Sequence, residues 1–451
     1  MDGKDLPKIP THLEEQLRLR RLRPELEPLA RELIELASAG SRELWPELTP
    51  ERLKDDPDFR HRFHVLAHDG MYKAQERMVE RILTGVPLDV SETILFRGVA
   101  DSIAWAMIGG QLCYARRLYR EQKQPNLAQS SFESVVAATR AIRERDPGCM
   151  PLITDLTSFI QVGDLMCVSP SRRMTLIEVK QGKHNKHVLD LVSFYQESGC
   201  ERFREILTQT ESPHTVKQFE RVMRQEARME FIGEVMGKGF AKDPDTRIDV
   251  SIPEQAVDME SWDEALNELI KRAREKNWAY EIQGSLFMGA YWGDPWSKQG
   301  HFAFLGALGL VRDLKKDFCI IRLADCMNHP LAPPIFSRPL EVETMFDLLF
   351  GRLNVCVAVS VPDLIHECEM AGLDARAATR KELAEARRTH ADPVLVDGKG
   401  VMFGLEGREM LLLGGIIFRA LFHGQRPASV IRGYLESSDE MPEPLAAEVG
   451  S

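Results

Sequence analysis

Three charged residues in the first half of the chain have the types and spacing that metal-dependent hydrolysis requires. Asp164 is followed, fourteen residues later, by Glu178-Val179-Lys180. In an extended strand the side chains of Glu178 and Lys180 point to one face, whereas Ile177 and Val179 point to the other face and can enter a core. The sequence therefore predicts a carboxylate and an amine together on one surface of a strand.

A short turn can bring Asp164 to the same surface. Apolar β-type segments end at Val168 and resume at Thr175, so we expect residues 169–174 to close a hairpin. Antiparallel pairing then places Asp164 opposite one of the residues 178–180. In the registers that pair it with Glu178 or Lys180 it shares their face, with Cβ atoms about 5 Å apart. We therefore expect three charged side chains to converge.

Two carboxylates at that separation repel each other unless a cation lies between them. Hard oxygen ligands favour Mg²⁺, which keeps several bound waters and accepts a substrate phosphate as a further ligand; Mn²⁺ is expected to substitute for it. A neighbouring lysine can orient a metal-bound water and offset charge on the scissile phosphate. The spacing thus predicts a metal site that hydrolyses phosphodiester bonds.

The trio resembles the motif of the PD-(D/E)xK nuclease superfamily, whose restriction-endonuclease-like core has the order αβββαβ. The resemblance covers roughly residues 131–236 of the chain. It implies that Asp164 and Glu178 are metal ligands and that Lys180 is the catalytic lysine. Gly163 stands where the name of the family has a proline.

Many members of this family also have an acidic residue on the helix before the first strand. Ser131 can cap such a helix, which Pro147-Gly148 would end, and Glu133 lies in its first turn. Glu133 is therefore a candidate fourth member of the catalytic set. The alternative is an acid that is simply favoured at a helix N-terminus.

Basic residues surround the trio, although the chain as a whole has a net charge of −11. Between residues 171 and 187 there are five basic residues and one acidic residue. Four of them define what we call the basic rim: Arg172, Arg173, Lys183 and Lys186. We expect the basic rim to contact the phosphate backbone of a nucleic acid, DNA rather than RNA. The alternative is a solvated loop.

The 451 residues, 43% of them hydrophobic, predict a folded α/β protein of more than one domain. Helical spacing predicts a helical region over residues 1–129. The nuclease-like core, with a mixed sheet, is expected over 130–292, with its last strand at 280–287 and a capped helix from Ser261 before it. An α+β region of unknown role is expected over 293–436, and a disordered tail over 437–451.

Cysteine usage and hydropathy indicate the compartment. The eight cysteines contain no C-x-x-C pair and mostly lie in apolar runs, as reduced core thiols do. The N-terminus lacks the apolar segment of a signal peptide. The longest apolar stretches, 103–113 and 410–418, are shorter than the roughly 20 residues of a membrane-spanning helix. We expect a cytoplasmic protein without a membrane partner.

Two other clusters of metal-ligand residue types are better explained by packing. His61, His64 and His68 recur on one helix face, and with Asp69 and Asp101 they faintly resemble an HD-type phosphohydrolase. No histidine in a suitable upstream helix completes that set, so surface or packing histidines are expected. Two Cys/His pairs, at 326–329 and 366–368, lack zinc-knuckle spacing and favour buried thiols.

Residues 362–390 and the hairpin expected at 394–403 admit two interpretations. They could form a winged helix-turn-helix that presents arginines such as Arg376 and Arg388 to DNA. An ordinary pair of amphipathic helices is favoured.

These observations together predict a Mg²⁺-dependent endonuclease that cleaves DNA. Its large flanking regions suit a regulated enzyme, such as one of restriction or anti-phage defence, and could mediate homo-oligomers or bind a partner protein; this is analogy at the level of the fold. The alternative is a catalytically silent nucleic-acid-binding or scaffold protein that keeps a nuclease-like fold.

Overall fold

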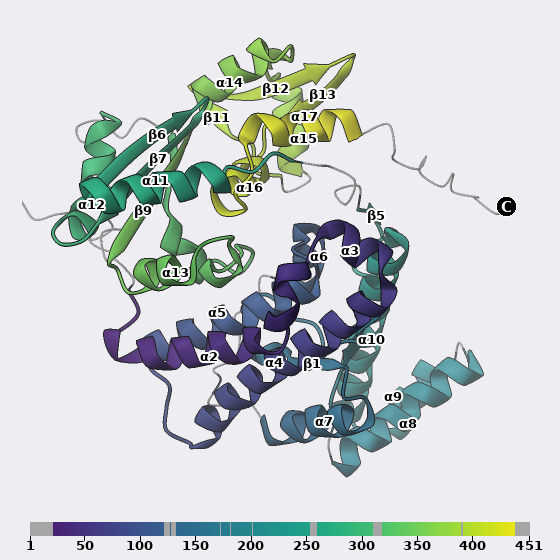
Figure 1. Cartoon of the computed structure of the whole chain (residues 1–451). Helices are drawn as coiled ribbons and strands as arrows, with labels where there is room; N and C mark the ends of the chain where they lie inside the picture. Colours follow the sequence, from purple (N-terminus) through teal and green to yellow (C-terminus); the bar gives the residue numbers. More distant parts are fainter. Residues whose placement is uncertain are drawn as a thin grey trace, which may run out of the picture. The chain divides into compact units, whose positions relative to one another are not determined.

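The computed structural model shows two compact units. It describes residues 21–120, 127, 132–171, 173–180, 182–200, 202–252, 259–309, 318–388 and 391–437. The N-terminal unit contains residues 28–252, and the C-terminal unit contains residues 259–437 together with 21–27. Figure 1 shows the first in purple to teal and the second mostly in green to yellow.

Helices dominate the N-terminal unit. They are α2 (Glu27–Ala39), η2 (Arg42–Glu47), α3 (Pro50–Asp55), α4 (Pro57–Leu83), α5 (Val90–Met107), α6 (Leu112–Leu118), α7 (Phe132–Arg145), η3 (Thr154–Leu156), α8 (Lys183–Ser198), α9 (Phe203–Thr210) and α10 (Pro213–Lys238). The strands are β1 (Met150–Ile153), β2 (Leu165–Val168), β3 (Met174–Ile177), β4 (Phe240–Lys242) and β5 (Asp249–Ser251). Helix starts follow local chemistry: Asp89 and Glu92 form a reciprocal capping box on α5.

Strands β1, β2 and β3 form an antiparallel sheet with β2 in the middle. All four residues of β2 are buried, so both faces of the sheet are covered. The register pairs Val168 with Met174 and Leu165 with Ile177. This confirms the expected hairpin, and it is the register that brings Asp164 opposite Glu178. The strand itself ends at Ile177, so the expected strand over 175–180 is too long at its C-terminal end.

The edge of this sheet at β1 is completed by a side chain from helix α4. The Gln75 amide donates to the Pro151 carbonyl at 2.9 Å and accepts from the Ile153 N–H at 2.8 Å. Gln75 is only 1% exposed, so its amide takes the place that a neighbouring strand would occupy. The helices expected as a separate region over 1–129 therefore pack directly on the sheet.

The expected last strand of the core, at 280–287, lies elsewhere, and this corrects the prediction. These residues form the hairpin of β6 (Trp278–Gln283) and β7 (Leu286–Trp292) in the C-terminal unit, and α11 (Asp263–Lys276) packs on it. Gly284, with φ of +57°, makes the tight turn. Local pairing across a two-residue turn costs less chain entropy than pairing with a distant sheet. The expected mixed sheet is also wrong, since every strand pair of the described residues is antiparallel.

The described residues of the C-terminal unit form two sheets. The first has the order β6-β7-β9-β8, and the second has the order β10-β12-β11 with β13 also paired to β12. Its remaining elements are η1 (Pro24–Leu26), α12 (Trp296–Ala307), β8 (Phe318–Arg322), η5 (Leu323–Asn328), η6 (Ile335–Ser337), α13 (Val342–Leu349), β9 (Leu353–Ser360), α14 (Val361–Met370), β10 (Asp374–Ala377), α15 (Arg380–Arg388), β11 (Leu395–Val396), β12 (Lys399–Leu405), β13 (Arg408–Leu411), α16 (Gly414–Phe422) and α17 (Pro427–Ser437). β9 is buried along its whole length and is the centre of this unit's core.

Strand β10 lies between helices α14 and α15 and pairs with β12. The two expected helices are present as α14 and α15, but a strand lies between them, so residues 362–388 form helix–strand–helix. Arg376 lies in β10 and contacts Glu382 at 2.7 Å and Glu409 at 2.6 Å. Its charge is thus already balanced by two carboxylates.

Candidate functional site

Asp164 is held at the start of β2 by the backbone of the neighbouring strand. Its N–H donates to the Ile177 carbonyl at 2.8 Å, and its carboxylate accepts from the Val179 N–H at 2.6 Å. Gly163 precedes it with φ of +74°, and a Cβ there would lie 3.1 Å from the Ile177 carbonyl oxygen. Proline requires a negative φ, so the position before Asp164 cannot hold the residue found in the name of the family.

Glu178 and Lys180 follow β3 and contact each other. The Lys180 Nζ lies 2.5 Å from the Glu178 Oε1, and the two side chains are 16% and 15% exposed. Gln225 of α10 joins both: its amide oxygen accepts from the Lys180 Nζ at 3.3 Å, and its amide nitrogen donates to the Glu178 Oε1 at 3.1 Å. Glu178 and Lys180 are therefore in contact, although β3 ends at Ile177, before either of them. Gln225 is a neighbour that the sequence did not reveal.

The charges of the trio act on one another. Burial and, after it, the Glu178 carboxylate raise the pKa of Asp164 to about 6, against the opposing effects of the Val179 N–H and the Lys180 amine. Asp155, in η3 between β1 and β2, is a third carboxylate in this group. Burial raises its pKa, Arg97 lowers it, and Glu178 raises it. The sequence did not point to Asp155 because residues 152–159 resemble a single apolar strand.

This set of donors fits a hard divalent cation. Asp164 and Glu178 are oxygen donors whose mutual repulsion a dication would relieve, and Mg²⁺ normally keeps several waters beside one or two carboxylates. In the part of the chain that the structure describes, no three His, Cys, Asp or Glu side chains form a group that could hold a metal ion. Because Mg²⁺ binds through as few as one or two protein carboxylates, Asp164 and Glu178 have the chemistry that it requires.

The loop that contains Asp155 is anchored by a buried carboxylate of α5. Asp101 accepts from the Ser158 N–H at 2.7 Å and from the Ser158 hydroxyl at 2.6 Å. Burial raises the pKa of Asp101 to about 7, against the opposing effect of Ser158 and Arg97. Folding thus favours the protonated acid.

This shift predicts a pH-dependent stability that Asp101→Asn removes. Below about pH 4 the acid is protonated in both states. As the pH rises from there toward 7, Asp101 ionises in the unfolded state but keeps its proton in the folded state, so stability is lost by up to about 1.4 kcal/mol per pH unit. The free energy of unfolding of Asp101→Asn, relative to the unmodified protein, should therefore rise between pH 5 and pH 7. Urea unfolding at both pH values measures it, with Asp190→Asn on the exposed face of α8 as control. Equal differences at both pH values would contradict the prediction.

The structure does not join Glu133 to the trio. Glu133 is exposed in the first turn of α7, and none of the hydrogen bonds or ion pairs of the described residues connects it to Asp164, Glu178 or Lys180. Ser131, its expected cap, lies outside the described residues. Both interpretations of Glu133, as a member of the catalytic set and as an acid favoured by a helix N-terminus, therefore stay predictions.

The basic rim is exposed where the structure describes it. Arg173 lies in the turn of the β2–β3 hairpin, and Lys183 and Lys186 lie in the first turn of α8, which starts after Gly182. None of these three has an ion-pair partner within the described ranges. Arg172 lies outside them. The three described cations are thus available to a phosphate backbone, and whether they bind one stays a prediction.

The histidine and cysteine clusters are structural. The His68 ring is buried and its Nδ1 contacts the Gly148 carbonyl at 2.8 Å; burial lowers its pKa. Asp69 forms an ion pair with Arg143 at 2.8 Å, and the Asp101 carboxylate accepts a hydrogen bond from the Ser158 hydroxyl. The thiols of Cys326 and Cys368 are buried and free, as expected. The distant resemblance to an HD-type phosphohydrolase therefore finds no support.

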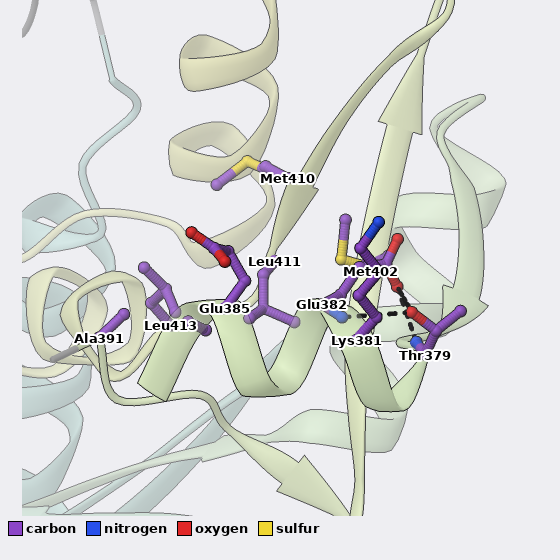
Figure 2. Close-up of a pocket in the computed structure, with 10 residues that line it drawn as sticks. Thr379, Lys381, Glu382, Glu385, Ala391, Met402, Met410, Leu411 and Leu413 are labelled. Carbon is purple, nitrogen blue, oxygen red and sulfur yellow. Dashed lines mark hydrogen bonds between the residues drawn. The ribbon is translucent and has the colours of Figure 1, made fainter. Parts of the chain in front are cut away.

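A groove of about 720 Å³ lies in the C-terminal unit between α15 and the strands β12 and β13 (Figure 2). Met402, Met410 and Leu411 supply apolar walls, and Lys381 and Glu385 come from α15. Glu382 is already bonded to Thr379 and Arg376. None of the residues that the sequence placed in the catalytic set lines this groove.

Within the described residues, no helix combines the length and the apolar character needed to traverse a bilayer. No protein-family model, curated protein or solved structure matches the chain.

Proposed function

We propose that the N-terminal unit is a Mg²⁺-dependent endonuclease that hydrolyses phosphodiester bonds of DNA, built on a restriction-endonuclease-like core. The observation behind this proposal is the convergence of Asp164, Glu178 and Lys180 at the open end of the β2–β3 hairpin. The order α7-β1-β2-β3-α8 agrees with the first five elements of that core. No further strand joins this sheet among the described residues.

Each member of the trio has a distinct role in this proposal. Asp164 and Glu178 would hold the metal, which supplies a Lewis acid and lowers the pKa of bound water. The Val179 N–H fixes the Asp164 carboxylate, and Gln225 fixes the positions of Glu178 and Lys180. The Lys180 amine can orient the attacking water and offset negative charge on the scissile phosphate.

The expected substrate follows from the charges near the trio. Arg173, Lys183 and Lys186 are exposed cations close in sequence to Glu178 and Lys180. Such cations bind phosphates without reading bases, so cleavage without strict sequence preference is expected. A role in restriction or anti-phage defence, and homo-oligomers or a partner protein bound by the flanking regions, remain proposals by analogy.

A cleavage assay tests the proposal directly. Supercoiled plasmid, linear duplex, single-stranded DNA and RNA are incubated with the full chain in Mg²⁺, in Mn²⁺ or in EDTA. We expect nicked or linear plasmid with either metal and none with EDTA. Absence of cleavage with every substrate and both metals would contradict the proposal.

One observation favours the alternative of a silent nucleic-acid-binding protein. The Lys180 amine and the Glu178 carboxylate contact each other at 2.5 Å, an arrangement that an ordinary structural ion pair would also show. A silent binder would retain affinity for DNA in EDTA and would cut no substrate with either metal.

Gln225→Leu is expected to lower cleavage about ten- to a hundredfold. The amide bonds both Glu178 and Lys180, and loss of a partner that orients a ligand typically costs this much in metal affinity or activity. Mg²⁺ titrations of the initial rate measure it, and the half-saturating Mg²⁺ concentration should rise. Gln218→Leu, seven residues earlier on the same helix, is the control. Equal rates for the two variants would show that Gln225 does not position the trio.

A further inference from the structure

Helix α10 presents a row of basic side chains that the sequence alone did not single out. Lys217, Arg221 and Arg224 are all exposed. They are four and three residues apart, so they lie along one face of the helix. None of them has an ion-pair partner within the described residues, although the exposed Glu220 lies beside them. We call Lys217, Arg221 and Arg224 the α10 stripe.

The opposite face of α10 is fixed by packing. Phe219 and Val222 are buried in a cluster that includes side chains of α8 and α9 such as Val192 and Phe203. Figure 1 shows these three helices side by side at the end of the N-terminal unit. The α10 stripe is therefore displayed on a supported helix, and binding would not require a loop to become ordered first.

The α10 stripe leads to the catalytic trio. Gln225 follows Arg224 directly and bonds both Glu178 and Lys180. At 1.5 Å per residue, the α10 stripe spans about 10 Å of helix and ends at the level of the site. At the start of α10 the His214 ring lies 4.8 Å from the His184 ring of α8. His184 lies between Lys183 and Lys186 of the basic rim in the sequence. The basic rim and the α10 stripe thus adjoin the same site.

The composition of this face favours phosphate contacts. Lysine and arginine neutralise phosphates, whereas binding of single strands normally adds aromatic side chains on which bases stack. Both phenylalanines of α10, Phe219 and Phe231, are buried. Neither phenylalanine of α10 is therefore available for stacking on bases, and the exposed charge of the α10 stripe suits contacts with phosphates.

We propose that the α10 stripe binds the phosphate backbone of a nucleic-acid duplex and directs it to the trio. This rests on the proposed nuclease function for its biological meaning, but binding is measurable without cleavage. Because the contacts are to phosphates, the interaction should depend on salt and not on base sequence.

The test is a triple charge reversal, Lys217→Glu with Arg221→Glu and Arg224→Glu, in the full chain. Fluorescence anisotropy in EDTA follows a labelled duplex of about 20 base pairs and one of its single strands. Duplex affinity should fall at least about tenfold, and the slope of log affinity against log salt should become shallower by about three. The matched control reverses Arg380, Lys381 and Arg387 of α15, which are exposed, lack ion-pair partners within the described ranges and lie in the C-terminal unit. It should bind like the unmodified protein.

The outcomes separate this proposal from the nuclease proposal. If the unmodified protein cleaves plasmid and the triple variant binds and cleaves duplex equally well, the proposed role of the α10 stripe is wrong and the proposed nuclease function is retained. If the triple variant loses duplex affinity but the unmodified protein never cleaves, the proposed role of the α10 stripe is supported and the proposed nuclease function is wrong. Loss of affinity for the single strand alone, or for anionic lipid vesicles but not for duplex, would overturn the proposal.

Discussion

Asp164→Asn and Glu178→Gln are each expected to reduce DNA cleavage at least about a hundredfold and to weaken Mg²⁺ binding. Both substitutions keep the shape of the side chain, and the amide oxygen of the Asp164→Asn variant can still accept from the Val179 N–H, so the loss would come from the missing negative charge. Initial rates on plasmid DNA and calorimetric Mg²⁺ titrations measure the two effects. The unfolding midpoints should stay close to that of the unmodified protein.

Lys180→Met completes this prediction, because the lysine has a different role from the two carboxylates. It should abolish cleavage to a similar extent while Mg²⁺ binding is retained. Glu144→Gln is the control, since Glu144 is exposed on α7 and belongs to no candidate catalytic set. Full activity of Lys180→Met would make the lysine structural. Full activity of all three variants would show that the chemistry occurs elsewhere.

Reversing the basic rim is expected to have the next largest effect. A variant with Arg172, Arg173, Lys183 and Lys186 all replaced by Glu should lose DNA affinity, and its salt dependence should be shallower by about one unit of slope for each phosphate that is no longer neutralised. Cleavage should fall in parallel, because the scissile phosphate is no longer delivered to the metal. Anisotropy in EDTA and cleavage rates in Mg²⁺ at several salt concentrations measure both.

The same variant can also refute the role of the basic rim. If it binds and cuts like the unmodified protein, these residues form a solvated loop, and the duplex approaches by another surface such as the α10 stripe. If both charge reversals weaken binding, the combined variant should show the sum of the two changes in salt slope, since each neutralised phosphate releases its own counterions.

The sequence was most informative where contacts are local. The sequence predicted a hairpin in which six residues connect Val168 to Thr175. In the structure Val168 pairs with Met174, so the observed register differs from the predicted one by one residue. Alternation of apolar and charged residues then determines which side chains share a face, so the approach of Asp164 to Glu178 could be anticipated.

Distant partners could not be predicted in this way. Gln225 lies 45 residues from Lys180 and reaches it only because α10 packs beside β3. Asp155 is placed by a 3₁₀ turn inside what resembled one long strand. The prediction of a core strand at 280–287 was wrong because it overlooked a local partner. Residues of β6 pair with the adjacent β7, and this local pairing is favoured over pairing with a distant sheet.

The amide of Gln75 has a consequence for how copies of this chain can associate. An open sheet edge offers unpaired N–H and C=O groups to any extended segment, and this is a common route to dimers and aggregates. At β1 those groups are taken by Gln75, and Pro151 has no N–H to offer. Gln75→Leu would leave both backbone groups buried without partners, at about 1–3 kcal/mol each. In the intact protein the sheet is thus protected at β1 from intermolecular strand addition, and any oligomer must use a different surface.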